Sequence, residues 1–392
     1  MARRSIRRVV KNGLAGALHR TGADRLIGRV LTGFRHVPLV ICYHRVVEDF
    51  RASARASIPS MLTSRRMLEQ HLDWIGRRYR FVTLDELGTR LESGREFDRP
   101  VAAITFDDGY RDVYENAFPL LQRKGIPAAM FVVSDLMGTS ELQVFDRLYA
   151  LLSSVLENGR DGHLALARAL SGPHVTSSPV DLKLRARLGG DPLAATGLLL
   201  NVLRRAQLED LLQILEDEIR LDSDSREGFC PLTWEMVSAM ARAGVTIGSH
   251  TRTHALLTSE SRPVALEEIA GSRDRLQQRL GIPIEHFAYP DGRFNAGLLG
   301  MVSEAGYRFA YTVCGHSSAD RPWLTIPRQV LWERSCVNSL GRFSPAVMSC
   351  HTHQVFDIPS RCRRDHGGGN PGEPADSRWA PLRRGHPAGV GE

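Results

Sequence analysis

The stretch Val101-Ala102-Ala103-Ile104-Thr105-Phe106-Asp107-Asp108-Gly109-Tyr110 decides the fold. Its first six residues are apolar or β-forming, which predicts a buried strand that delivers two carboxylates at its end. A helical spacing of apolar residues follows over 114–121, and residues 128–133 restore a strand-like pattern. Strand, helix and strand in this order indicate a parallel βα unit.

The same alternation recurs along most of the chain. Further strand-like runs lie at residues 37–43, 245–249, 284–289, 308–313 and 324–330. We therefore expect an α/β fold, a distorted (β/α) barrel of about seven strands, over residues 36–345. Residues 136–228 show helical patterns without a convincing strand, so they predict a helical insertion into the barrel.

The two ends of the chain differ from this core. Residues 1–35 hold nine of the basic residues, and residues 5–33 read as one basic amphipathic helix. Such a segment is a solvated helix, or it contacts an anionic membrane peripherally; no motif supports binding to nucleic acid. Residues 346–392 are rich in Gly, Pro, Arg and Asp, which predicts a disordered tail.

Composition and targeting signals suit an enzyme of a reducing compartment. The chain is 42% hydrophobic and 24% charged, and its six cysteines show no C-x-x-C spacing. Polar residues interrupt the N-terminal apolar pattern, so we expect no signal peptide, and we find no apolar run long enough to span a bilayer. These features predict a cytoplasmic protein, with any membrane contact made through residues 1–35.

Two clusters of polar residues follow predicted strands. Asp107 and Asp108 end the strand quoted above, although an Asp-Asp-Gly sequence is also a common helix cap and turn. His250 and His254 follow another strand, and we expect them four apart on one helical turn, so that both face one side. In a barrel both clusters would meet at the carboxyl ends of the strands.

Two imidazoles and one carboxylate are the ligand set of a catalytic zinc site, because three protein ligands leave a position for water. A metal held in this way polarises a carbonyl and lowers the pKa of water, and the second carboxylate can accept a proton. Spacing alone does not tell which aspartate has which role. A backbone N–H near Tyr110 would complete the site by stabilising an oxyanion.

These residues resemble the motifs of the NodB-type polysaccharide deacetylases of carbohydrate esterase family 4. Residues 105–110 resemble the first motif of that family, 249–254 the second, and 287–292 the third. The resemblance implies a divalent metal, usually Zn²⁺ with Co²⁺ as an alternative, and an acetylated polysaccharide or oligosaccharide substrate. It also implies that Asp108, His250 and His254 bind the metal and that Asp107 is the general base.

Two departures point to the exopolysaccharide-associated branch of the family. Ala288 stands where the third motif carries an arginine, and Ile326-Pro327-Arg328 replaces the Leu-x-His of the last motif. The missing general acid then has to come from elsewhere, and His44 is our candidate, unless it only caps the first strand. Arg328 either replaces the missing arginine beside Asp107 or forms a surface ion pair.

We expect the substrate to be contacted by residues that share the same rim, namely Tyr110, Tyr289, Pro290, Asp291, Gly292 and Arg328. The chain is thus predicted to be a metal-dependent hydrolase that removes N-acetyl groups from an amino-sugar polymer. Two alternatives stay open: an amidase acting on a small non-sugar amide, and a non-catalytic protein that binds sugar or metal. A spare, unliganded Asp107 argues against the second of these.

Overall fold

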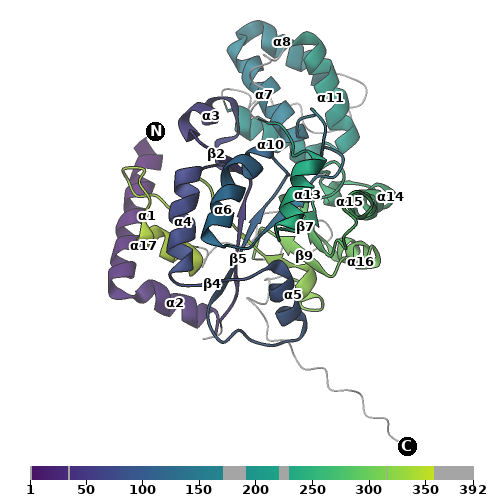
Figure 1. Cartoon of the computed structure of the whole chain (residues 1–392). Helices are drawn as coiled ribbons and strands as arrows, with labels where there is room; N and C mark the ends of the chain where they lie inside the picture. The colour runs from purple at the N-terminus through teal and green to yellow at the C-terminus, as the bar shows by residue number, and fades with distance from the viewer. Residues whose placement is uncertain (1, 34–35, 171–190, 220–228, 316, 357–392) are drawn as a thin grey trace, which may run out of the picture.

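The computed structural model describes the chain except for residues 1, 34–35, 171–190, 220–228, 316 and 357–392 (Figure 1). The main sheet has nine strands, of which eight follow one another in the order β10-β9-β8-β7-β6-β5-β1-β11, and every pair in it is parallel. They are β1 (Leu39–Tyr43), β5 (Val101–Phe106), β6 (Ala128–Val132), β7 (Thr246–Ser249), β8 (His286–Ala288), β9 (Phe309–Thr312), β10 (Ile326–Pro327) and β11 (Gln329–Val330).

A single residue closes this sheet into a ring. Arg328 separates β10, which pairs with β9, from β11, which pairs with β1. The Arg328 N–H donates to the Thr312 carbonyl on one side, and the Leu331 N–H donates to the Cys42 carbonyl on the other. The predicted distorted (β/α) barrel is confirmed, with residues 326–330 acting as one bent closing strand.

Helices cover the outside of the barrel. They include α4 (Arg65–Gly76), α5 (Leu84–Glu92), α6 (Phe118–Lys124), α13 (Trp234–Arg242), α15 (Ser272–Leu280) and α16 (Ala296–Glu304). The ninth strand of the sheet, β4 (Arg80–Phe81), pairs with the start of β5, and a separate two-stranded sheet is formed by β2 (Arg45–Val47) and β3 (Leu62–Ser64). Large apolar side chains of the strands and helices pack between these two layers.

The alternation of side chains along β5 separates the inside of the barrel from the outside. Ala102, Ile104 and Phe106 belong to the outer core against the helices, whereas Val101 and Ala103 belong to the inner core. All six residues are buried, as expected for a parallel strand covered on both faces. Two-residue periodicity then places Thr105 and Asp107 in the inward row.

Between β6 and β7 the described secondary-structure elements are all helices, and Pro231 forms an isolated bridge with Tyr110. α7 (Val144–Glu157), α8 (Gly159–Leu170), α10 (Pro192–Val202) and α11 (Arg205–Glu218) pack around an apolar cluster of their own. Arg147 of α7 forms ion pairs with Glu209 and Glu216 of α11, which ties the group together. Figure 1 shows α7, α8 and α11 grouped at one end of the barrel.

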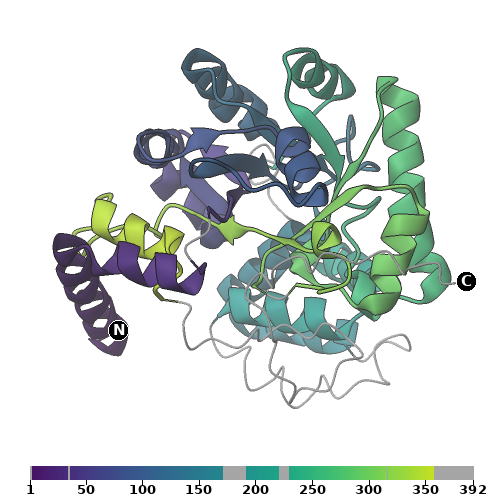
Figure 2. The same ribbon diagram turned by 90° about the horizontal axis from the view of Figure 1, so that it is seen from below.

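The two ends of the chain meet each other. Residues 2–31 form two helices, α1 (Ala2–Thr21) and α2 (Ala23–Leu31), because Gly22 breaks the expected single helix with a φ of 73°. Both contact α17 (Pro345–Thr352), which lies beside them in Figure 2. The expectation of disorder from residue 346 was therefore wrong for α17, which buries Val347 and Cys350 next to Ala15.

The rest of that tail, from residue 357, lies outside the described residues. Among the helices that the structure describes, none has both the length and the apolar character needed to cross a membrane.

Candidate active site

Asp107 lies in the inward row of β5 and is held by Arg328 of the closing strand. Arg328 Nη1 is 2.7 Å from Asp107 Oδ1, and Nη2 is 2.7 Å from Oδ2. The same Nη1 donates to the Thr105 hydroxyl at 3.1 Å, and the Cys42 thiol donates to Asp107 Oδ2 at 3.3 Å. Burial alone would raise the pKa of Asp107, but the Arg328 charge outweighs it and lowers the pKa below its usual value.

Asp108 turns away from this row because its backbone is left-handed. Its φ is 74°, and Gly109 follows at 78°, a turn in which a side chain at 109 would collide with Met137. The Asp108 carboxylate is buried, yet neither of its oxygens has a hydrogen-bond partner among the described residues. Burial and the negative charge of Asp107 raise the pKa of Asp108 well above its usual value.

His250 and His254 face this carboxylate. Asp108 Oδ1 is 3.5 Å from His250 Nε2 and 3.4 Å from His254 Nε2. The other ring nitrogen of His250, Nδ1, lies 2.8 Å from the Ala288 carbonyl, which fixes its orientation. Burial lowers the pKa of both histidines, so both rings are neutral and each can offer a lone pair.

The expected helical turn between the two histidines was wrong. Residues 250–256 form a bend without helical hydrogen bonding, with left-handed backbone at Thr251 (φ 70°) and His254 (φ 60°). Glu268 holds this bend by accepting from the N–H groups of Arg252 and Thr253, at 2.9 Å each. The rings still meet edge to face, 4.8 Å between centroids.

Asp108, His250 and His254 are suited to a divalent metal. Their ligand atoms all lie within 4.8 Å of one another, and the set offers one carboxylate and two neutral imidazoles. A buried carboxylate without any hydrogen bond is costly unless a cation compensates it. The unpartnered oxygens of Asp108 therefore fit a bound cation better than they fit a structural role.

His44 lies at the end of β1, close to Asp107. Its ligand atom is within 4.8 Å of those of Cys42 and Asp107, and its Nδ1 is buried without a partner among the described residues. Burial lowers the pKa of His44 to about 4, so its ring is neutral at pH 7. His44 and His254 are the partly exposed members of the cluster, and the site is open to solvent on their side.

The other predicted substrate residues do not share this opening. Tyr289 is fully buried in the outer core between Phe287 and Phe294, because it points outward from β8. Tyr110 is buried too, and its hydroxyl donates to Asp146. These two side chains, like that of Arg328, contact protein where we had expected them to contact substrate.

The turn at Pro290–Gly292, which ends the third motif, does not share this opening either. Pro290 and Gly292 are buried, and the Gly292 carbonyl accepts from the Thr312 hydroxyl. Asp291 is half exposed at a φ of 53° and pairs with Arg293 at 2.7 Å. Asp291 is therefore the exposed residue of this turn.

The helical insertion contributes to the site, which no motif had indicated. Gln143 donates from Nε2 to the Asp108 carbonyl at 3.1 Å, and the Phe145 ring meets the His254 ring edge to face at 5.0 Å. Asp146 accepts from the Tyr110 hydroxyl, and burial raises its pKa to about 6. Three residues at the start of α7 thus connect the insertion to the site, through contacts with Asp108, His254 and Tyr110.

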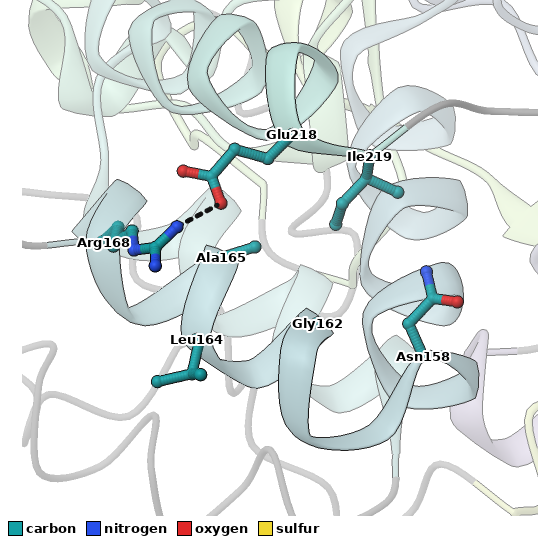
Figure 3. A pocket seen from close by; sticks show the side chains of 7 residues that line it. All are labelled: Asn158, Gly162, Leu164, Ala165, Arg168, Glu218 and Ile219. Carbon is teal, nitrogen blue, oxygen red and sulfur yellow. Dashed lines mark hydrogen bonds and ion pairs between the residues drawn. The ribbon is translucent and has the colours of Figure 1, made fainter.

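A hollow on the insertion is unrelated to this chemistry. It has a volume of about 470 Å³ and is lined by Asn158, Gly162, Leu164, Ala165, Arg168, Glu218 and Ile219 (Figure 3). Its charged members, Arg168 and Glu218, neutralise each other across 3.4 Å. Asp108, His250 and His254 do not border this hollow.

The chain is therefore a (β/α) barrel protein. At the carboxyl ends of its strands, one carboxylate and two histidines are arranged as they would be to bind a metal. Residues 94–163 and 192–310 match the family model of the polysaccharide deacetylases, and the chain belongs to that family. The gap between the two matched segments falls within the insertion.

Individual relatives are distant. A polysaccharide deacetylase-like protein of Bacillus subtilis, YxkH, is 30% identical over 80 residues, which cover 20% of this chain and 29% of the relative. The poly-β-1,6-N-acetyl-D-glucosamine N-deacetylase of Staphylococcus epidermidis is 29% identical over 110 residues, 26% of this chain and 38% of the relative. The matches thus span less than half of the length of these curated relatives.

Solved structures of similar shape include the Streptococcus pyogenes deacetylase PplD, determined in complex with acetate, and IcaB from Ammonifex degensii. The first is 18% identical with a TM-score of 0.48, covering 77% of this chain and 95% of PplD. The second is 19% identical with a TM-score of 0.47, covering 80% of this chain and 97% of IcaB.

Proposed function

We propose that the protein is a metal-dependent hydrolase that removes N-acetyl groups from an amino-sugar polysaccharide or its oligosaccharide precursor. The observation that carries the proposal is the buried, unpartnered Asp108 carboxylate facing His250 and His254, next to a second carboxylate that Arg328 keeps ionised. A protein that only bound metal or sugar would gain nothing from holding Asp107 charged beside that cluster.

Asp108, His250 and His254 would hold the metal, for which Zn²⁺ is our first choice and Co²⁺ the alternative. Once bound, the metal would supply Lewis acidity towards the acetyl carbonyl and towards water. The exopolysaccharide-associated substrate class rests on the sequence resemblance and on the similarity to the staphylococcal deacetylase.

The residues of the chain divide the proton transfers between them. Asp107 accepts a proton from the attacking water, because Arg328 leaves it ionised, and the water oxygen bonds to the acetyl carbon. The C–N bond then breaks, and the proton that Asp107 took from water passes by way of His44 to the departing amine, giving acetate and a free amino group. Because His44 is neutral at pH 7, it donates to the amine only a proton that it has received during the reaction.

One observation favours a second candidate, an amidase acting on a small molecule. The side chains of Asp107, Asp108 and His250 are each at most 3% exposed, and that of His254 is 17% exposed. Reacting side chains that are so little exposed would suit a small amide more readily than an inner unit of a polymer. Acetate release from N-acetylglucosamine oligomers of increasing length separates the two, since a polymer enzyme gains kcat/KM with length.

The direct test is acetate release by purified protein loaded with Zn²⁺ or Co²⁺. We expect Asp107→Asn to abolish release while metal content, measured by elemental analysis, stays at the wild-type level. Asp320→Asn, an exposed carboxylate on another loop, is the matched control and should be fully active. Activity of Asp107→Asn would refute the assignment of the base. Metal-loaded wild type that releases acetate from no glycan would refute the proposed function.

A further inference from the structure

Helices α1 and α2 have a buried side and an exposed side. On the buried side Ala15 is 0% exposed in a cluster with Val347 and Cys350 of α17, and a side chain at Gly28 would collide with His353. Among the described elements, α1 and α2 have their main contacts with each other and with α17, and their remaining faces carry exposed side chains.

These outer faces carry large apolar side chains, contrary to the usual pattern of a helix on a protein surface. Five large apolar side chains there are more than half exposed: Val9 (55%), Val10 (63%), Leu14 (52%), Leu26 (59%) and Val30 (59%). Scattered exposed leucines are ordinary, but a group on two adjoining helices marks an interaction site. We refer to these five residues, with Arg20, Arg25 and Arg29, as the N-terminal surface.

The basic members of this surface have no counter-charge. Arg20, Arg25 and Arg29 are exposed, and none of them forms an ion pair with any residue in the described part of the chain. Arg77 and Arg78 directly follow α4, and burial together with the positive charges of Arg25 and Arg77 lowers the pKa of Arg78. The one acidic residue among the first 35, Asp24, is buried against His19 at 2.8 Å.

We propose that the N-terminal surface docks the protein onto a bilayer rich in anionic phospholipid. Exposed apolar side chains beside unpaired arginines are what an interfacial helix offers: the apolar groups enter the acyl boundary and the arginines neutralise lipid phosphates. A second copy of the chain fits less well, since a symmetric contact would bring the arginines of one copy against those of the other. This inference is independent of the proposed activity.

Vesicle sedimentation with the full chain tests it. We expect the protein to sediment with vesicles of mixed phosphatidylglycerol and phosphatidylcholine, and salt should weaken this binding. Vesicles of phosphatidylcholine alone should bind little. Each arginine at an anionic surface strengthens binding roughly fivefold, so Arg25→Glu with Arg29→Glu should weaken it at least about 25-fold. Leu26→Ser with Val30→Ser should also reduce binding.

Matched controls place comparable changes on other faces. Arg123→Glu with Arg242→Glu reverses two exposed charges on α6 and α13, and Leu340→Ser removes an apolar group that is 79% exposed. Both should bind vesicles like the wild type. Acetate release from soluble oligomers should be the same for all variants, which separates this surface from the active site.

Three results would overturn the inference. The first is wild-type protein that does not sediment with anionic vesicles. The second is equal binding to phosphatidylcholine vesicles. The third is a dimer in analytical ultracentrifugation that Leu26→Ser with Val30→Ser converts to a monomer, which would assign the surface to a second copy.

Discussion

Arg328 and Asp107 form a two-point ion pair inside the barrel, with both Nη–Oδ distances at 2.7 Å and both side chains almost fully buried. Arg328 is also the residue between β10 and β11, where the sheet closes between β9 and β1. One residue therefore completes the barrel and orients the proposed base. The arginine missing at position 288 of the third motif is replaced by one that reaches Asp107 from the closing strand.

Arg328→Lys should reduce kcat strongly while leaving the protein folded. Lysine keeps the positive charge but cannot form the planar two-point contact, so Asp107 would lose its fixed orientation. Arg308→Lys, in an exposed pair with Glu92, is the control and should change activity little. Arg328→Ala would leave Asp107 charged and alone, at a cost of about 3–5 kcal/mol in the free energy of unfolding. Wild-type kcat in Arg328→Lys would count against the positioning role.

The same pair predicts a change in the pH profile. Arg328 lowers the pKa of Asp107 in the folded state, so the ionised form prevails above that pKa and is lost as the pH falls through it. A weaker partner raises this pKa, and the acidic limb of kcat/KM for Arg328→Lys should move to higher pH. A pH series of acetate release measures the shift. An unmoved acidic limb would mean that another group sets it.

Asp108→Asn should make the metal-free protein more stable and should remove metal binding. The wild-type carboxylate is buried without a hydrogen bond, and its raised pKa shows that ionisation is unfavourable in the absence of a cation. Zn²⁺ at a hundredfold excess over Kd should stabilise the wild type by about 2.7 kcal/mol and leave Asp108→Asn unchanged. Thermal melts with and without Zn²⁺ measure both effects. Equal stabilisation of the two proteins would place the metal elsewhere.

His44→Gln should lower kcat by about 10²–10⁴-fold, as expected for loss of a general acid, with metal content unchanged. His163→Gln, an exposed histidine on α8, is the control and should behave like the wild type. If His44→Gln turned over normally, His44 would merely cap the end of β1. If instead it lost metal, His44 would belong to the ligand set.

The sequence predicted the barrel and the members of the cluster better than it predicted their local geometry. The apolar run 101–106 and the two clusters at strand ends were visible because strand periodicity and parallel topology place them. The left-handed backbone at Asp108, Thr251 and His254 was not visible, since no residue type requires it there. The position of Tyr289 was predicted wrongly, because the motif identifies the residue but not whether its side chain points into or out of the barrel after β8.

Contacts between segments far apart in the chain could not be predicted from the sequence. Arg328 could equally have been a surface residue. Nothing in the sequence around it shows that β10 and β11 form the strand that closes the barrel between β9 and β1. Phe145 lies in a stretch with no motif, and its contact with His254 depends on how α7 packs over the barrel.

Phe145 provides a test of whether the insertion supports the site. Its ring packs edge to face on His254, so Phe145→Ala should leave that ring free to turn and should weaken Zn²⁺ affinity about 10-fold or more, in the range found for residues that orient metal ligands. Phe145→Leu retains most of the volume and should recover part of the affinity. Leu164→Ala, an exposed position on α8, is the control for general effects on the insertion. Competition titrations with a zinc indicator measure the affinities, and thermal melts of the metal-free proteins show whether each variant is folded. An unchanged affinity in a folded Phe145→Ala protein would mean that His254 is held by its own bend and that α7 only covers it.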